Sequence, residues 1–272
     1  MCGIVGMIGK AQAASHLFNG LSRLQYRGYD SAGIATLVDG RIERRRAEGK
    51  LSNLAAVLER QPLQGTIGIG HTRWATHGRP SEINAHPHAT EKVAIVHNGI
   101  IENFQELRSE LEALGMRMTS ETDTEVVAHL LTHLLECGYS PQEAMEAAMG
   151  RLKGAFSLAA LFADRPDIMI GARRGSPLAV GYGDGEMFLG SDAMAIAPFT
   201  DRICYLEEDD WAVLSADGAT IFNEGNPVNR AVTRTAVSLA AVGKGKHPHF
   251  MMKEIAEQPV VISETLRGYF DP

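Results

Sequence analysis

Three Asp-Gly pairs divide this chain at points between apolar or alternating runs: Asp39–Gly40, Asp184–Gly185 and Asp217–Gly218. An Asp-Gly pair in such a setting favours a two-residue turn that joins antiparallel strands. Parallel strands would instead need long crossover connections. The repeated hairpin signal therefore predicts antiparallel sheet and argues against a doubly wound parallel sheet.

Hydrophobic periodicity predicts more strands than helices, and it places the helices in the middle of the chain. The predicted helices are 101–114, 126–135 and 141–152. The second helix should stop at Gly138, and Ser140–Pro141 begins the third. The predicted strands are near 3–8, 33–38, 66–73, 93–97, 155–163, 168–173, 187–190, 203–206 and 211–215. We expect an α+β fold in which helices pack outside the sheets.

Composition excludes some classes of function. The chain has 272 residues, enough for one large domain or two small ones, and its 44% hydrophobic and 22% charged residues are ordinary for a globular protein. A net charge of −7 gives no basic excess to hold a phosphate backbone, so nucleic-acid binding is not expected. The run Arg44–Arg45–Arg46 is flanked by Glu43 and Glu48, which indicates a solvated face.

The expected location is the cytoplasm. No apolar run is long enough to span a bilayer, and the N-terminus lacks the basic region of a secretory signal. The cysteines, Cys2, Cys137 and Cys204, are odd in number and widely spaced, which fits a reducing compartment.

The sequence changes character near residue 235. Ala236–Gly245 is rich in small residues and glycine, which indicates a linker, and residues 251–267 then have helical spacing. A lone helix after a linker has nothing of its own to pack on. We therefore expect a domain over 2–235, and a linker over 236–272 that enters a second, truncated part of a longer protein.

The second residue carries a chemical hypothesis. Methionine is normally removed when the next side chain is small, which would leave Cys2 with a thiol and a free α-amine. An α-amine has a pKa of roughly 7.7–8.0, so it can act as the base for its own thiol. If Met1 is retained, that amine lies in a peptide bond and the base is absent. The alternative is that Cys2 is a small buried hydrophobic residue.

Longer motifs strengthen this hypothesis. The start CGIVG resembles the class II glutamine amidotransferases, a branch of the N-terminal nucleophile hydrolases. Further stretches resemble the glutaminase domain of the glucosamine-6-phosphate synthase family: RLQYRGYDSAG (23–33), HTRWATHG (71–78), NAHPH (84–88), VHNGIIEN (96–103) and SETDTEV (120–126). The similarity covers residues 2 to about 235, with the motifs in the family's order. The stretch HFMMKEIAEQPV resembles the linker into that family's sugar-isomerising half.

The resemblance implies a four-layer αββα sandwich of antiparallel sheets and a reaction without metal or organic cofactor. L-Glutamine would be hydrolysed to glutamate and ammonia through a thioester on Cys2. In the whole enzyme the ammonia would convert fructose 6-phosphate, bound by the isomerase half, to glucosamine 6-phosphate. We expect the full-length protein to be a homodimer. From the charge and the lack of a long apolar run we expect no nucleic-acid or membrane partner.

Asn98–Gly99 is a second candidate feature. A hairpin turn is one interpretation, but the helical periodicity that starts at Ile101 favours a strand-to-helix connection. A side-chain amide next to a glycine N–H offers two donors for a developing oxyanion. By resemblance, Asn98 and Gly99 form the oxyanion hole.

Arg73 and Asp123 would read the two charges of an amino acid. The planar guanidinium of Arg73 suits an α-carboxylate, and by resemblance Asp123 binds the α-ammonium. The alternatives are a surface-paired arginine and a helix-capping acid, since Thr122 and Glu125 resemble a capping box around Asp123. By resemblance, Thr76 and His77 also contact glutamine, and Trp74 gates the passage of ammonia on a mobile loop over 73–81. Arg27 and Gly28 are expected near the nucleophile, without a separate role.

A metal site is an alternative for the histidine-rich stretch. Its histidines are His71, His77, His86, His88 and His97. No cysteine or acidic residue falls at zinc-like spacing from them, so hydrogen bonds to backbone or substrate are the preferred interpretation.

Two other functions stay open. One is the amide-transfer domain of another class II enzyme, such as an asparagine synthetase or a phosphoribosyl amidotransferase, against which HTRWATHG and SETDTEV argue. The other is a glutamine-binding regulatory module without turnover, which would bind glutamine saturably and release no ammonia.

Overall fold

The computed structural model describes residues 2–234 and 245–270. The chain divides into one unit that ends at Ala236 and a second that begins at Val237. The linker predicted over Ala236–Gly245 lies outside the described residues, except for Gly245. In the second unit, helix α8 (Phe250–Phe270) confirms the helix predicted over 251–267. No described helix combines the length and the apolar character that crossing a membrane requires.

The first unit contains two antiparallel sheets. The first sheet has the order β15 (Val232–Arg234), β11 (Arg202–Tyr205), β9 (Ala179–Tyr182), β10 (Met187–Gly190), β1 (Gly3–Ile8), β4 (Ile67–Arg73), β2 (Ser31–Val38), β3 (Arg41–Glu48). The second has the order β14 (Asn226–Val228), β13 (Gly218–Asn223), β12 (Trp211–Ser215), β8 (Arg165–Arg174), β7 (Phe156–Phe162), β6 (Val93–Gly99), β5 (His88–Ala89). The predicted antiparallel architecture is thus confirmed, and each predicted strand overlaps an observed one.

The Asp-Gly pairs join neighbouring strands as predicted. Asp39–Gly40 connects β2 to β3, and both residues have positive φ, 50° and 74°, as a type I′ turn requires. Asp184–Gly185 connects β9 to β10, and Asp217–Gly218 lies at the turn between β12 and β13. Local turn chemistry therefore sets much of the sheet order.

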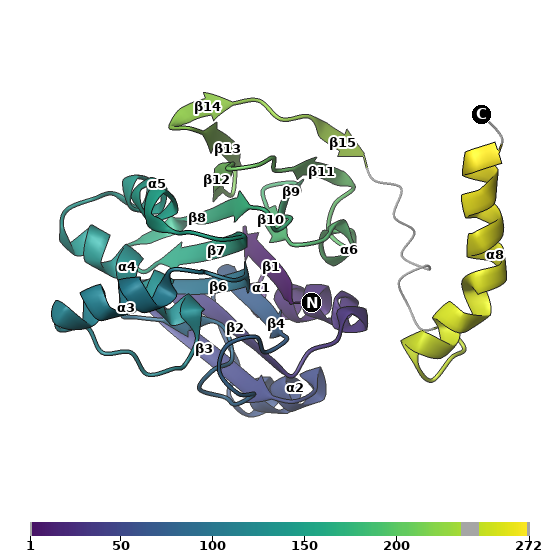
Figure 1. Ribbon diagram of the computed structural model, residues 1–272, viewed down its shortest axis with the longest axis horizontal. Coiled ribbons are helices and arrows are strands. Elements are labelled where there is room, and N and C mark those ends of the chain that lie inside the picture. The colour runs from purple at the N-terminus through teal and green to yellow at the C-terminus, as the bar shows by residue number, and fades with distance from the viewer. Residues whose placement is uncertain (1, 235–244, 271–272) are drawn as a thin grey trace. The chain divides into compact units, whose positions relative to one another are not determined.

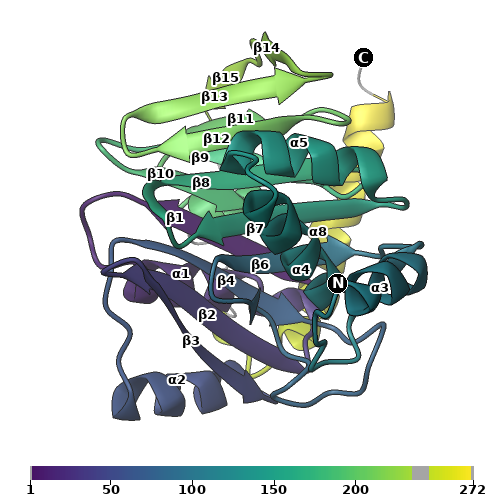
Figure 2. The same ribbon diagram turned by 90° about the vertical axis from the view of Figure 1, so that its left-hand side faces the viewer.

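Helices cover the outer face of each sheet, so the unit has four layers. Helix α1 (Ala13–Arg23) packs on β1 and β4, and α2 (Leu51–Arg60) packs on β2 and β3. On the other side, α4 (Asp123–Glu136) packs on β6 and α5 (Pro141–Arg151) on β8, with α3 (Phe104–Ala113) beside α4. Figures 1 and 2 show α3–α5 on one side of the paired sheets and α1 on the other. The predicted αββα sandwich is confirmed.

The alternation of side chains along β1 shows how the layers are held together. Ile4 and Ile8 belong to the apolar cluster between the two sheets, which also includes Ala94, Val96 and Leu161. The intervening Val5 packs against α1, because a Cβ added at Gly20 would lie 2.9 Å from its Cγ1. A strand buried on both faces has no polar alternation, and all six residues of β1 are buried.

Helix ends follow the sequence signals in the middle of the chain. Ser140 and Glu143 form a reciprocal capping box at the start of α5, with Pro141 as the first residue of the helix. Gly138 takes a φ of 95° after the end of α4. Thr122 caps α4 by accepting from the Glu125 N–H at 3.4 Å. Helices α1 and α2, together with the short helix α6 (Ala193–Ile196), are not predicted by the hydrophobic periodicity.

One prediction about the surface is wrong. Arg44, Arg45 and Arg46 lie on strand β3 and are half-buried, not a solvated face. Arg46 donates to the carbonyl oxygens of Ile83 and Ala85, both at 2.9 Å. Burial, with the charge of Arg44 added, lowers the pKa of Arg46 to about 10. A loop that presents carbonyl oxygens to the edge strand accounts for this burial.

Candidate active site

Cys2 directly precedes β1, at the end of the first sheet that faces β6 of the second. Since Gly3 pairs with Thr72, the residues that follow Thr72 on β4 lie opposite Cys2. The Trp74 N–H donates to Cys2 Sγ at 3.2 Å, and Sγ is 3.5 Å from the Trp74 carbonyl oxygen. The thiol is therefore held by the backbone of one residue of the 73–81 loop.

A cavity of about 540 Å³ opens in front of the thiol. Its lining combines predicted site residues from both sheets with neighbours that the sequence did not indicate: Cys2, Arg27, Trp74, Thr76, Asn98, Gly99, Ile100, Ser176 and Pro177. The structure thus brings together Cys2, Asn98, Gly99, Trp74 and Thr76 in one space. Arg73, His77 and Asp123 are not among the residues that line this cavity.

Burial raises the pKa of the Cys2 thiol above its ordinary value, although the Trp74 N–H bond and the charge of Arg73 act in the opposite direction. The thiol is therefore protonated at neutral pH. A nucleophile of this kind needs a base within reach, because the thiolate and not the thiol attacks.

Asn98 spans the space between the nucleophile and a buried histidine. Its Nδ2 is 3.3 Å from the Cys2 carbonyl oxygen, and its Oδ1 is 2.9 Å from His71 Nε2. Gly99 follows at the end of β6 with a φ of 116°. A Cβ there would lie 2.0 Å from the Ala155 carbonyl oxygen, so only glycine fits. The predicted strand-to-helix connection at Asn98–Gly99 is confirmed, since α3 follows at Phe104.

Arg73 is buried, with 3% of its surface exposed. Its Nη2 donates to the carbonyl oxygens of His77 and, at 3.1 Å, of Gly78. Its Nη1 is buried and has no hydrogen-bond partner within the described part of the chain. Burial lowers the pKa of Arg73, opposed by the negative charges of Asp30, Asp123 and Glu121 and by that of Cys2 when its thiol is ionised. An unpaired buried guanidinium nitrogen is costly, which makes it a candidate anion contact.

Asp123 is the first residue of α4 and is also buried. Its Oδ2 accepts from the Ile101 N–H at 2.9 Å and is 3.8 Å from His97 Nδ1. The carboxylate therefore anchors the backbone that leaves Asn98–Gly99. This structural role replaces the interpretation of Asp123 as a helix-capping acid, because Thr122 and not Asp123 is the residue that caps the helix.

The loop that carries Trp74, Thr76 and His77 rests on the 23–33 motif. A Cβ at Gly28 would lie 2.3 Å from the Trp74 ring, so glycine lets the indole pack closely. Asp30 accepts from the Ala75 N–H at 2.5 Å and donates its own N–H to the Arg73 carbonyl oxygen at 2.7 Å. The Trp74 side chain is 53% exposed, while the His77 ring packs edge-on against Phe104 at 5.2 Å.

Several residues that support the site were not assigned a role from the sequence. Arg27 donates to the Cys2 carbonyl oxygen at 3.3 Å and pairs with Asp192 at 2.5 Å. Asp30 anchors the loop, and His71 contacts Asn98. The only sequence signal was their place inside the quoted motifs. No sequence signal indicated Asp192, because it is 165 positions away from Arg27 in the sequence.

The remaining buried histidines bond to side chains rather than to backbone, so that part of the histidine prediction is wrong. His86 Nε2 and His97 Nδ1 both contact Thr124 Oγ1, at 2.6 and 3.0 Å, and His88 Nε2 contacts Thr122 Oγ1 at 3.0 Å. Burial lowers the pKa of each, to about 3 for His88. Among the described residues no group of His, Cys, Asp or Glu has the arrangement of a metal site.

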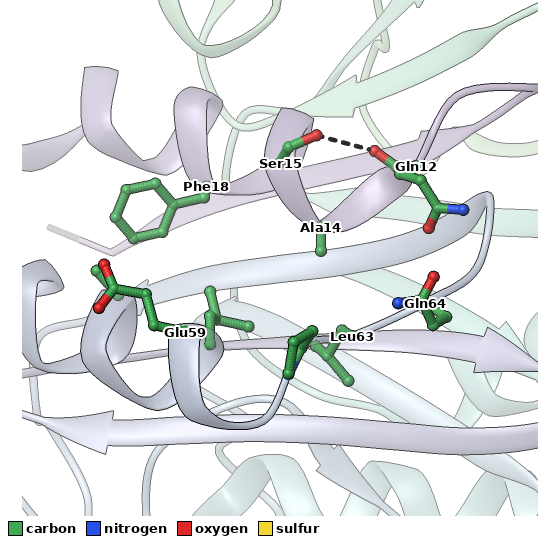
Figure 3. Close-up of a pocket in the computed structure, with 10 residues that line it drawn as sticks. Gln12, Ala14, Ser15, Phe18, Glu59, Leu63 and Gln64 are labelled. Atoms are coloured by element: carbon green, nitrogen blue, oxygen red, sulfur yellow. Dashed lines mark hydrogen bonds between the residues drawn. The ribbon is translucent and has the colours of Figure 1, made fainter.

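A second cavity, of about 440 Å³, lies between α1 and α2 (Figure 3). Phe18, Leu58 and Leu63 line it together with exposed polar residues such as Gln12 and Glu59. The hydroxyl of Ser15 in its lining is exposed and donates to the Gln12 carbonyl oxygen at 3.2 Å, and the charged residue of the lining, Glu59, is exposed. The chemistry therefore points to the cavity at Cys2.

Comparison with known proteins agrees with this geometry. A glutamine amidotransferase domain family matches residues 71–198. The whole chain is 61% identical to a glutamine–fructose-6-phosphate aminotransferase (isomerizing) of Brucella suis, and 59% identical to one of Bradyrhizobium diazoefficiens. Each match covers 100% of this chain and 45% of the relative, so the chain spans about half the length of the curated relatives it matches.

Solved structures share the fold. Glutamine phosphoribosylpyrophosphate amidotransferase from B. subtilis superposes with a TM-score of 0.71 at 24% identity, over 82% of this chain and 49% of that one. An allosteric regulatory enzyme of purine biosynthesis gives a TM-score of 0.71 at 25% identity, with the same coverage. At such identity the likeness concerns the fold.

Proposed function

The chain carries a glutamine amidotransferase domain, and from this premise we propose that it hydrolyses glutamine to glutamate and ammonia with Cys2 as the nucleophile. The observation that supports this most strongly is the position of Cys2 Sγ. It faces a cavity whose wall includes the amide of Asn98, which also reaches the Cys2 carbonyl oxygen.

In the first step Cys2 Sγ attacks the side-chain carbonyl carbon of glutamine. The thiol proton passes to the α-amine of Cys2, which is free once Met1 is removed; Met1 lies outside the described residues. That proton is then given to the departing nitrogen, the C–N bond breaks, and ammonia leaves a γ-glutamyl thioester. Water, deprotonated by the same amine, hydrolyses the thioester to glutamate and restores the thiol.

Asn98 and Gly99 would stabilise the negative oxygen that forms during both steps. The Asn98 amide nitrogen has two hydrogens, of which the Cys2 carbonyl oxygen accepts one. The second is available to the oxyanion, and the Gly99 N–H is the proposed partner donor. Loss of one such donor typically costs roughly 10²–10³ in rate.

Arg73 and Asp123 are the proposed contacts for the charged end of glutamine. The unpaired Nη1 of Arg73 suits the α-carboxylate, and Asp123 suits the α-ammonium. We assign further substrate contacts to Thr76 and His77. Trp74, which is exposed and packs on Gly28, is the proposed gate for ammonia. Its loop is held by the hydrogen bond from the Ala75 N–H to Asp30.

The longer protein is also a matter for proposal. Because relatives of about twice this length are named glutamine–fructose-6-phosphate aminotransferases, we propose fructose 6-phosphate as the acceptor of the ammonia. The acceptor site, a homodimeric state and a cytoplasmic location all belong to this proposal. The domain boundary near residue 235 belongs to it as well.

The experiment combines intact mass with turnover. The intact mass of the purified protein is measured by mass spectrometry before and after exposure to a glutamine analogue that carries an electrophile. Ammonia release from glutamine is measured in parallel. We expect loss of the methionine mass, one adduct, and turnover that falls by on the order of 10⁴-fold or more in Cys2→Ser. Since the serine is nearly isosteric, the thermal unfolding midpoint of the variant should match that of the wild type.

Two outcomes would contradict the proposal. A processed protein that takes no adduct and binds glutamine without releasing ammonia is a binding module. A full-length protein that releases ammonia but does not aminate fructose 6-phosphate has a different acceptor, as another class II enzyme would.

A further inference from the structure

The Asn98 amide lies between two groups that together determine its orientation. Its two side-chain hydrogen-bond partners in the described part of the chain are the Cys2 carbonyl oxygen and His71 Nε2, at 3.3 and 2.9 Å. A carbonyl oxygen can only accept, so the amide atom that faces Cys2 must be the nitrogen. The amide oxygen therefore faces His71.

That orientation determines the tautomer of His71. An amide oxygen needs a donor, so we assign the proton of the imidazole to Nε2. The backbone of His97 lies close to the ring, but Nδ1 makes no hydrogen bond of acceptable geometry within the described part of the chain. His71 is fully buried, and burial lowers its pKa to about 3, so the ring stays neutral throughout the working range of an enzyme. The centroid of the ring lies 4.3 Å from that of the His86 ring, and the two rings are tilted by 53°.

The strand geometry explains why a donor comes from this position. His71 and Arg73 are two residues apart on β4, so both project from the same face of the first sheet. Ile69, two residues earlier on the same face, belongs to the apolar cluster between the sheets. Asn98 meets His71 there from β6 of the second sheet, and both side chains are buried.

We propose that His71 is a positioning residue of this site: its Nε2–H holds Oδ1 of Asn98, so that the second hydrogen on Nδ2 faces the oxyanion. Without this bond the amide can rotate and present its oxygen to the developing negative charge. The inference rests on the proposed glutaminase function. It assigns no contact between His71 and glutamine.

The test compares three variants of the processed protein. His71→Phe keeps a ring of similar size and removes the donor, whereas His71→Gln keeps a donor. His88→Phe is the matched control, because His88 is buried in the same cluster but bonds to Thr122 and not to Asn98. For each variant we would measure kcat and KM for glutamine, the thermal unfolding midpoint, and the rate at which iodoacetamide alkylates Cys2.

Alkylation separates positioning from damage, because it uses the thiol but forms no oxyanion. We expect kcat of His71→Phe to fall by roughly 10–100-fold, with KM within about threefold and the alkylation rate within about twofold of wild type. His71→Gln should recover part of kcat. In His88→Phe, any effect passed through Thr122 to Asp123 should appear in KM.

The outcomes that overturn the proposal are distinct. An unchanged kcat in a folded His71→Phe shows that Asn98 needs no such donor. A parallel fall in alkylation, or an equal fall in kcat for His88→Phe, shows a general structural role. If His71→Phe does not fold, a His71→Gln variant with wild-type stability and no recovered turnover decides against it. Wild-type protein without ammonia release would refute the proposed function itself.

Discussion

Two cavities of the first unit have similar size but differ in the polar groups around them. The cavity at Cys2 has a volume of about 540 Å³, and the one between α1 and α2 about 440 Å³ (Figure 3). Around the second, the polar side chains, such as Gln64, are exposed and already solvated. In the loop that contributes Trp74 and Thr76 to the cavity at Cys2, the Nη1 atom of Arg73 and the Nδ1 atom of His77 are buried without a hydrogen-bond partner in the described part of the chain.

The difference teaches that unpaired buried polar groups, and not volume, mark the site. The exposed side chain of Gln64 already has water as a hydrogen-bond partner, so a ligand would not relieve any cost there. A buried guanidinium nitrogen without a partner, in contrast, costs free energy until something binds it. An apolar hollow lined by Phe18 could equally be a packing irregularity. Four perturbations can break or sharpen this contrast.

The largest effect is expected at Gly99. In Gly99→Ala the added methyl would lie 2.0 Å from the Ala155 carbonyl oxygen, at a φ of 116° that alanine rarely adopts. The shift of the backbone should reduce kcat by roughly 10²-fold and destabilise the fold by about 1–3 kcal/mol. Ammonia release and urea unfolding measure the two effects.

Gly115→Ala is the control for backbone strain. Gly115 also has positive φ, 90°, but nothing lies within 4 Å of an added Cβ. It should lose stability of about 1 kcal/mol without losing turnover. Equal loss of kcat in both variants would mean that the effect at Gly99 is not local to the site.

Arg73→Lys should weaken glutamine binding next most. Lysine keeps the charge but has a single nitrogen, so it cannot hold the carbonyl oxygens of His77 and Gly78 and also place a second nitrogen at the α-carboxylate. We therefore expect KM to rise by about 30-fold with a smaller change in kcat. The matched control is Arg79→Lys, an exposed arginine on the same loop. If KM does not change in Arg73→Lys, then the buried Nη1 is not a substrate contact.

Acid should destabilise the site cluster in a defined direction. Burial lowers the pKa of His71 and His88 to about 3, and the other buried histidines shift the same way. Between about pH 6.5 and 3 the unfolded chain binds more protons, so the stability present at neutral pH is lost as pH falls. Each such histidine contributes a slope of up to about 1.4 kcal/mol per pH unit.

Urea unfolding at pH 7 and pH 5 measures this slope. The fall in the free energy of unfolding should be smaller in His88→Phe, which lacks one of the titrating rings. A wild-type free energy that is the same at both pH values would mean that the histidines are accessible to protons in the folded state.

The smallest effect is expected in the other cavity. Phe18→Ala should leave kcat and KM within about twofold of wild type, because the residues that line that cavity are all different from those that line the cavity at Cys2. Its cost should appear only in unfolding. A large change in turnover would show that the α1–α2 hollow is coupled to catalysis, and the contrast between the two cavities would fail.

The features that could be predicted from the sequence have local causes. Asp39–Gly40 specifies its own turn, and Ser140 with Glu143 specifies a helix start within four residues. The supporting partners could not be predicted. Asp192 reaches Arg27 across 165 positions of sequence, and no periodicity encodes such a contact. The prediction that the arginines of β3 form a solvated face was wrong for the same reason, because the loop that buries them comes about 40 residues later in the chain.

By itself, the sequence determined the antiparallel class of the fold and the chemical suitability of Cys2, because turn geometry and the pairing of a thiol with its own amine are properties of neighbouring atoms. The tertiary structure decided which donors meet that thiol. Asn98 reaches Cys2 only because β6 of one sheet stacks on β1 and β4 of the other, and His71 orients it from between the layers. Sheet stacking depends on the packing of the whole apolar cluster, so it has no local signature in the chain.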